Sequence, residues 1–217
     1  MASQGIVGAW FAKADQNSGN VLADTTNGLD ETGVYFADGH TNATAEGLTQ
    51  IQLGNLSGTV TPQFANNKQK RASKGEAYPT AQVTFLDIEF NAQQKLLGMD
   101  SDGKGGFTPS SVLKPVYALF KTQTLDKQHD IYYALTNCHV TTGNKTLGTN
   151  NQNEVDSNDE MTFNSKSPIK DSMFKGKSYK VYSSIDAKFN FDDMMAEVFP
   201  GYKKQTTVTP STNTDGN

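Results

Sequence analysis

The chain has 217 residues, a formal net charge of −4 and 43 residues of Leu, Ile, Val and Phe, which suits one β-rich domain with a modest core. Because charges of both signs are interspersed and aromatic residues are plentiful, we expect a folded protein. The single cysteine excludes an intramolecular disulfide framework, and no run of about 18 apolar residues predicts a membrane-spanning helix. The first residues lack a secretory signal pattern, so we expect the protein to stay in a reducing cytoplasm.

The first quarter of the chain predicts strands separated by one long polar excursion. Residues 5–13 are apolar enough for a strand, whereas residues 15–47 are rich in Asn, Gly, Thr and Asp. The short apolar run 34–36 inside this excursion indicates one short strand pair. Residues 48–60 alternate weakly and are interpreted as a strand that bends or bulges at its glycines.

The segment 61–80 carries a cluster of four basic residues without helical or strand periodicity. We therefore predict an exposed loop. The sequence pI of about 5.3 argues against a general nucleic-acid surface. If these cations have a partner, an acidic surface on another protein subunit is favoured.

Residues 81–90 are the best candidate for a central strand, and a short helix is expected to follow. Partway along this strand the apolar residues switch from odd-numbered to even-numbered positions. This switch predicts either a bulge near Phe85 or burial of both faces. Asn91 is the predicted N-cap of the helix, and Gly98 is its predicted end. The residues expected to pack this helix onto the sheet are Phe90, Leu96 and Leu97.

Two further hairpins are predicted in the second half of the chain. Residues 115–122 and 131–140 are β-prone and are separated by a short polar segment. Residues 143–160 have almost nothing to bury and predict a solvated or disordered loop. Residues 161–165 are then expected to pair with the alternating run 179–191.

The chain is expected to close with a helix and a tail. Asp192 and Asp193 begin a short amphipathic pattern that stops at Pro200 and Gly201. The polar segment from Lys203 onward is predicted to be loose. The expected organisation is therefore one domain over residues 1–202, with long loops at about 15–47, 61–80 and 143–160, and a flexible tail over residues 203–217.

No motif in the sequence predicts a catalytic, metal or cofactor site. Cys138 and His139 are adjacent, and neighbours on a strand point to opposite faces, so they cannot form a thiol–imidazole pair. The acidic stretch that begins at Asp100 resembles a calcium loop, but its fifth position is Lys104 and its twelfth is Ser111. A glycine-rich turn is the favoured interpretation, and we expect no enzyme.

Three short motifs resemble the major tail proteins of siphophages that infect Gram-positive bacteria. They are Leu-Gly-Asn-Leu at 53–56, Ala-Gln-Val-Thr-Phe at 81–85, and Gln-Lys-Leu-Leu-Gly at 94–98. In that family a strand, a long loop, a second strand and a short helix follow one another in this order. The resemblance covers roughly residues 48–200, and residues 1–47 and 203–217 fit it only loosely.

The resemblance implies a mainly β protein, a tail-tube-type β-sandwich flanked by a short α-helix and carrying long loops. It also implies hexameric rings stacked helically into a tube through which double-stranded DNA passes without specific binding. The implied partners are further copies of the chain, a tape-measure protein, and tail-terminator or distal tail proteins. The implied location is the virion, after assembly in the host bacterial cytoplasm, with no cofactor and no membrane.

The resemblance also suggests two sets of functional residues. Family members use long loops between rings, so the predicted inter-ring contacts are Phe64, Lys68, Lys70, Arg71, Lys74 and Tyr78. A passage for DNA must avoid cations, so the predicted lining acids are Asp87, Glu89 and Asp186. These acids could equally face solvent on the outside of the assembly.

Two other functions compete with this interpretation. A β-sandwich carbohydrate-binding or adhesion module would need exposed aromatic residues, for which Trp10, Tyr132 and Tyr182 are the candidates. The inner-tube protein of a contractile injection system would share the fold and be surrounded by a sheath.

Overall fold

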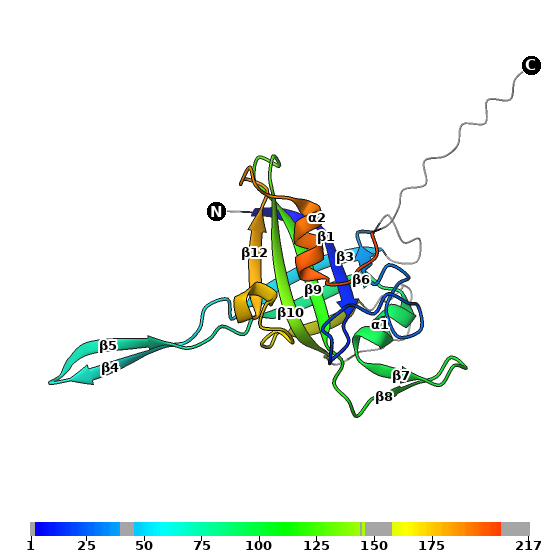
Figure 1. Ribbon diagram of the computed structural model, residues 1–217, viewed down its shortest axis with the longest axis horizontal. Coiled ribbons are helices and arrows are strands. Elements are labelled where there is room, and N and C mark those ends of the chain that lie inside the picture. The colour runs from blue at the N-terminus through cyan, green and yellow to red at the C-terminus, as the bar shows by residue number, and fades with distance from the viewer. Residues whose placement is uncertain (1–2, 40–45, 144, 146–157, 205–217) are drawn as a thin grey trace, which may run out of the picture.

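Two antiparallel sheets that share one long strand form the body of the protein in the computed structural model, which describes residues 3–39, 46–143, 145 and 158–204 (Figure 1). The helix-covered sheet contains, in spatial order, β2 (Tyr35–Ala37), β1 (Ser3–Lys13), β9 (Val116–Thr124), β10 (Asp130–Thr142) and β12 (Tyr179–Ser183). The open sheet contains β10, β11 (Asp159–Asn164), β6 (Thr80–Asp87) and β3 (Gly47–Gly54). The architecture is the predicted β-sandwich.

Strand β10 passes from one sheet into the other. Its first half pairs with β9 and β12, and its second half pairs with β11. The pairing with β9 shifts register between Leu135 and Cys138, and Asn137 between them has a φ of 45°. A bulge of this kind bends a strand, which lets the two sheets cross at a large angle.

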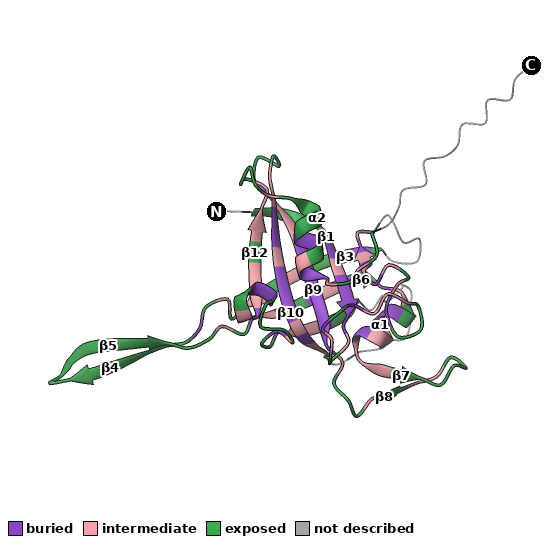
Figure 2. Ribbon diagram, in the orientation of Figure 1, coloured by how far each residue is buried: buried purple, intermediate pink, exposed green. Residues whose placement is uncertain are grey.

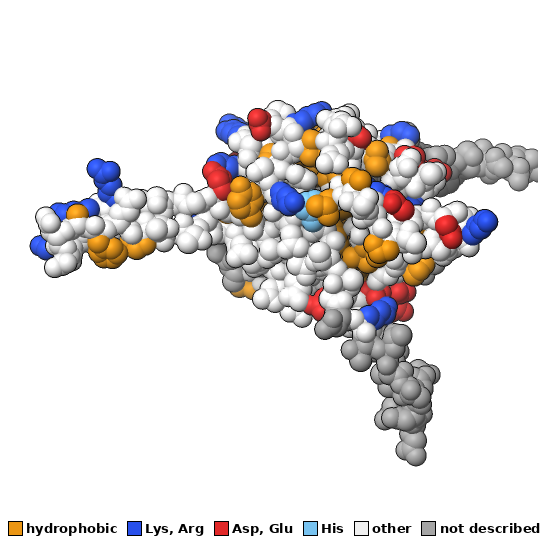
Figure 3. Space-filling view, turned by 90° about the horizontal axis from the view of Figure 1, so that it is seen from below, with side chains coloured by type: hydrophobic (Ala, Val, Ile, Leu, Met, Phe, Trp, Pro, Cys, Tyr) orange, Lys and Arg blue, Asp and Glu red, His pale blue; other side chains and the backbone are white. Residues whose placement is uncertain are grey.

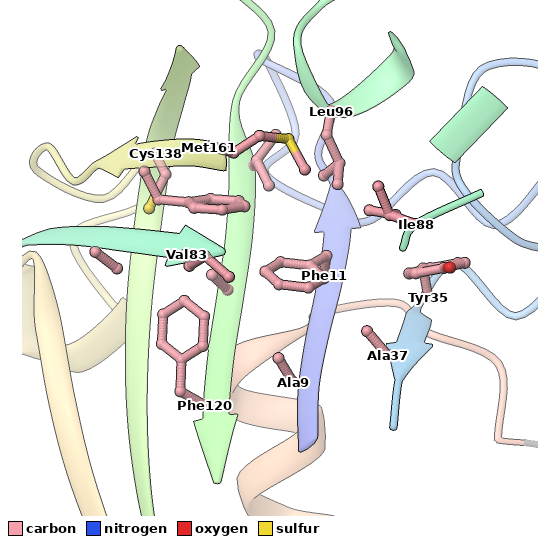
Figure 4. Close-up of a cluster of buried hydrophobic side chains, with 14 of the residues drawn as sticks. Ala9, Phe11, Tyr35, Ala37, Val83, Ile88, Leu96, Phe120, Cys138 and Met161 are labelled. Atoms are coloured by element: carbon pink, nitrogen blue, oxygen red, sulfur yellow. The ribbon is translucent and has the colours of Figure 1, made fainter. Parts of the chain in front are cut away.

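The main core lies between the two sheets. Phe11, Val83, Phe120 and Met161 point into the same space from four different strands (Figure 4). The ring of Phe11 stacks on that of Phe163 with centroids 5.0 Å apart. These side chains are almost completely buried, so the alternation of each strand is satisfied by the facing sheet.

A second core lies on the outer face of the helix-covered sheet, under α2 (Phe191–Val198) and the short 3-10 helix η1 (Met173–Gly176). Met194 and Val198 are buried there against Tyr117. The side chain of Asn190 accepts hydrogen bonds from the backbone amides of Asp192 and Asp193 at 2.8 and 3.2 Å. The predicted closing helix is thus confirmed, with an N-cap that sequence reasoning did not name.

Helix α1 (Phe90–Leu96) covers one end of the sandwich and corrects the predicted cap. The helix starts one residue before Asn91, and its N-cap residue Glu89 makes no side-chain cap bond. Leu96 is buried as predicted, whereas Phe90 is 58 % exposed and packs only edge-to-face on Phe107. Gly98 follows the helix with a φ of 74°, as expected for the residue that ends it.

Several strand predictions are confirmed. The short apolar run 34–36 lies at β2, and the hairpin of β9 with β10 forms as expected. In β6 the apolar residues switch from one face of the strand to the other near Phe85. The pairing of β3 with β6 shifts register next to Phe85 and Asp87, so the predicted bulge is present. The predicted glycine-rich turn lies in a hairpin of β7 (Met99–Ser101) and β8 (Phe107–Pro109).

Two further predictions about local structure are wrong. The segment 61–80 is largely a hairpin of β4 (Val60–Ala65) and β5 (Lys68–Lys74), with no residue of either strand buried. The run 179–191 does not pair with β11; only β12 is a strand, and it pairs with β10. Alternation in a sequence sets which residues share a face and leaves the partner strand open. The predicted loop 143–160 lies mostly, and the tail 203–217 almost entirely, outside the described residues.

We expect Phe163→Ala to lower the free energy of unfolding by about 3–5 kcal/mol, because it removes a fully buried ring from between the sheets. Denaturant unfolding followed by circular dichroism measures the loss. Phe90→Ala is the matched control, since it removes an exposed ring with one edge contact, and should cost about 1 kcal/mol or less. Equal losses in the two variants would contradict the core described above.

Candidate functional site

The cysteine–histidine pair has no catalytic geometry. Cys138 is completely buried, and burial raises the pKa of its thiol well above the usual range. Its Sγ lies 3.6 Å from the backbone oxygen of Thr136. His139 lies on the opposite face of β10, where burial and nearby Lys166 lower the pKa of its imidazole. A thiol held protonated and turned away from its neighbour is not a nucleophile.

The stretch that begins at Asp100 is a structural turn. One carboxylate oxygen of Asp102 accepts hydrogen bonds from the backbone amides of Lys104 and Gly106 at 2.7 and 2.9 Å. Asp100 forms an ion pair with Lys114. Within the described residues no cluster of three His, Cys, Asp or Glu side chains could hold a metal ion, and no helix is long and apolar enough to cross a membrane.

The outer face of the open sheet is mostly polar and carries almost no charge, and exposed Leu86 near the end of β6 is its apolar exception. Its side chains alternate with the buried residues of the same strands, as in β6, where Gln82 and Thr84 flank Val83. The residues that the register brings onto this face are Gln50, Gln52, Thr80, Gln82, Thr84, His139, Thr141, Glu160, Thr162 and Asn164. The side chain of Gln82 donates a hydrogen bond to Glu160. None of the four strand segments of this sheet contains Lys or Arg.

Both edges of the open sheet have backbone groups available for pairing. Among the described strands, β3 pairs only with β6, so its other edge has no partner. At the other edge, β10 pairs with β9 only as far as Cys138, and its last residues pair on one side alone, with β11. Unpaired strand edges are a template for further strand addition.

The predicted lining acids lie in three different parts of the fold. Asp87 is the last residue of β6 and is exposed. Glu89 lies outside that strand, at the N-cap of α1, and Asp186 lies in a turn after β12, where it accepts a hydrogen bond from the amide of Lys188 at 2.9 Å. The placement of Glu89 and Asp186 on strands was therefore wrong, because both strands end earlier than their alternating pattern. Their role as lining residues stays a prediction.

The hairpin of β4 and β5, here called the arm, projects away from the body (Figure 1) and is exposed along its whole length (Figure 2). Cross-strand partners share a face, so Val60, Pro62 and Phe64 lie on one side with Ala72, and Lys74 joins them at the base of the arm. Arg71 lies on the other side with Gln63, as does Lys68 with Ala65. Figure 3 shows apolar side chains on one side of the arm and Lys and Arg side chains on its other side and tip.

The base of the arm is fixed to the body. The amide of Gly75 donates to the carbonyl of Thr59 at 2.9 Å, and a Cβ on Gly58 would lie 1.7 Å from the carbonyl oxygen of Gly75. Only glycine permits this close approach of the two chains entering the arm. The hydroxyl of Tyr179 donates to the carbonyl of Leu56 at 2.7 Å. The arm therefore leaves the body at a defined point.

The arm contains five of the six predicted inter-ring residues. Phe64, Lys68, Lys70, Arg71 and Lys74 lie on its strands, and Tyr78 lies beyond its base, 49 % exposed. Sequence reasoning missed that this segment is a hairpin. The signals were the alternation of Val60, Pro62 and Phe64 and the two-residue turn Asn66–Asn67, both with positive φ.

The comparison with known proteins identifies one family. A family model described as phage tail tube protein matches residues 1–207, almost the whole chain. A search of curated proteins found no match.

We expect Cys138 to be unreactive toward a thiol reagent such as DTNB in the native protein, because the side chain is buried and its thiol pKa is raised. One equivalent should react after unfolding in denaturant. Ile185→Cys is the control, since this side chain is 46 % exposed and its thiol should react at once in the native state. Rapid labelling of the native wild-type protein would show that the sheet opens around β10.

Proposed function

The chain belongs to the phage tail tube protein family, and we propose that its copies polymerise as stacked hexameric rings that form the tube through which genomic DNA passes. As a member of this family, the protein is a structural component of the phage tail. The feature of the fold that carries the proposal is the open sheet, which combines two unpaired edges with strands that contain no Lys or Arg.

The unpaired edges support ring closure. If β3 of one copy lies beside the end of β10 of the next, the open sheets of neighbouring copies continue into one barrel. Such a head-to-tail contact uses two different surfaces, and it closes into a ring when the rotation between copies permits. Ring closure also removes the exposed edges, which otherwise favour aggregation.

The polar outer face supports passage of DNA. In the proposed barrel this face lines the bore, so DNA phosphates meet Gln, Thr and Asn side chains and the carboxylate of Glu160. Each Lys or Arg that neutralises a phosphate adds affinity, and a bore without such residues lets DNA slide. The lowered pKa of His139 keeps its imidazole neutral at pH 7, so it adds no positive charge. In this arrangement Asp87, at the end of β6, contributes to the rim of the bore.

The arm supports contact between rings. A two-stranded hairpin alone is marginally stable in water, and none of its residues is covered by the body. A neighbouring copy that covers the arm would supply the missing burial. We further propose that the tube assembles in the cytoplasm of a Gram-positive host with a tape-measure protein and with terminator or distal tail proteins.

The three aromatic residues proposed for carbohydrate binding do not form an exposed platform. The face of Trp10 stacks on Phe36 at 4.5 Å, and Tyr132 is 3 % exposed. The hydroxyl of Tyr182 donates to Glu197 at 3.0 Å, and its ring carries Lys180 above it. None of the three presents a flat open ring to a sugar.

Charge reversal of Lys68, Lys70, Arg71 and Lys74 to Glu should abolish long tubes while the monomer folds normally, because these exposed side chains serve only contacts between copies. Negative-stain microscopy measures tube length, and circular dichroism checks folding. Reversal of Lys127 and Lys188 to Glu, at two exposed positions outside the arm and the aromatic pocket, is a control for charge alone. Normal tubes from the arm variant would refute the role of the arm.

The double variant Gln52→Lys and Gln82→Lys should retain tubes but slow DNA ejection by on the order of tenfold or more at low salt, because it adds phosphate-binding cations to the bore. Phage carrying the variant are assayed for ejection rate at several salt concentrations, and the defect should shrink as salt rises. Ile185→Lys places a cation outside the open sheet as the control. An unchanged ejection rate would place this face elsewhere than the bore.

A further inference from the structure

An aromatic pocket of about 480 Å³ opens between α2 and β2 on the body of the protein. It is referred to below as the aromatic pocket, and the side chains that define it are Trp10, Val34, Phe36, Phe191 and Met195. The ring of Trp10 is held by Phe36 at 4.5 Å and by Phe191 at 6.1 Å. Phe191 is still 40 % exposed, so the pocket presents preformed apolar surface to solvent.

The rim of the aromatic pocket is acidic. Asp30 and Asp192 line the pocket itself, and Asp24 and Glu31 line an adjoining hollow that shares Thr32 with it. The two lysines at this rim are already engaged. Lys204 forms an ion pair with Asp192 at 2.5 Å, and Lys203 donates to the backbone oxygen of Ala23 at 3.1 Å. Four carboxylates stand against these two lysines and Lys95, which donates to the backbone oxygen of Thr25 next to Asp24. The surface keeps a small excess of negative charge that favours a cationic partner.

The arm has the complementary chemistry. Phe64 is 67 % exposed and lies on the apolar side of the hairpin, near its tip. The arm contains four cations and no acid. An exposed aromatic side chain surrounded by cations fits an aromatic pocket ringed by carboxylates, because the ring supplies buried area and the charges set orientation. The arm projects away from the body, so Phe64 cannot fill the pocket of its own chain (Figure 1).

We infer that the aromatic pocket of one copy receives Phe64 from the arm of a second copy. This inference rests on the proposed self-assembly and specifies one contact within it. The cations of the arm face the carboxylates of the rim, and the apolar side of the arm covers Trp10 and Phe191. The contact joins two different surfaces, so it propagates from copy to copy.

A second exposed apolar surface is the alternative docking surface for the arm. It lies around the β7–β8 hairpin and includes Phe90, Val112 and Leu113, each more than half exposed. Apolar side chains gather at this end of the molecule, opposite the arm, in Figure 3. The aromatic pocket is favoured because it is concave and its rim is acidic. The cysteine cross-linking experiment below distinguishes between the two docking surfaces.

Engineered cysteines test the contact directly, because the native Cys138 is buried and does not compete. Gln69 is the cross-strand partner of Phe64, so Gln69→Cys places a thiol beside the ring and leaves the ring in place. In tubes of the double variant Gln69→Cys and Val34→Cys, mild oxidation should convert most of the protein into a covalent ladder on a non-reducing gel. The matched control is Gln69→Cys with Leu113→Cys, which should give no ladder, as should each single variant.

Each outcome separates the contact from the proposed function. Tubes that cross-link only through Leu113→Cys, or through neither pair, overturn the inference and leave the tube function standing. Absence of rings and tubes in the wild type overturns both.

A second measurement uses the same anchor residue. Phe64→Ala should raise the protein concentration needed for tubes by on the order of tenfold or more, and Phe64→Trp should restore assembly. Val112→Ala, at a side chain 56 % exposed on the other surface, should change nothing. Loss of assembly in Val112→Ala with none in Phe64→Ala overturns the inference.

Discussion

The structure depends on one strand that serves two sheets. The first half of β10 lies in the helix-covered sheet and its second half in the open sheet, with the bulge around Asn137 between them. This bend turns the inner faces of both sheets toward one core, where Phe11 meets Phe163. It also fixes which surfaces remain outside. Because α2 covers the outer face of the first sheet, the open sheet is the one of the two whose outer face no helix covers in the described part of the chain.

The division between the two outer faces explains how a chain with few large apolar residues is organised. Burial is concentrated between the sheets and under α2, where Leu119 and Val198 are completely buried. The outward-facing side chains of the open sheet are mainly uncharged and polar, as in the case of Gln82. Such a face neither drives collapse nor attracts phosphate, which are the properties that the proposed bore requires. The surfaces proposed for assembly are therefore the edges of the open sheet, the arm and the aromatic pocket.

Sequence reasoning predicted most of the strands and both helices, because their apolar residues alternate or recur against a real core. The hairpin of β9 and β10 and the helix that begins near Asp192 are examples. It assigned the wrong partner strand to β12, because the alternation of apolar and polar residues does not determine which strand lies next to it. It missed the arm as a hairpin because cations interrupt a short alternating pattern. The cations and Phe64 were nevertheless recognised as the exposed surface.

The arm has a defined hairpin conformation although none of its strand residues is buried. Every residue from Val60 to Ala65 is exposed, yet the turn at Asn66 and Asn67 and the crossing at Gly58 impose a definite hairpin. Backbone geometry can therefore specify a shape that burial does not stabilise. In the proposed assembly a second copy supplies the burial that the body does not, and a hairpin with an exposed ring and four cations fits a partner that offers an aromatic pocket with acidic groups. In the proposed tube, the copies bury the surfaces that the monomer leaves uncovered, so that assembly completes the fold.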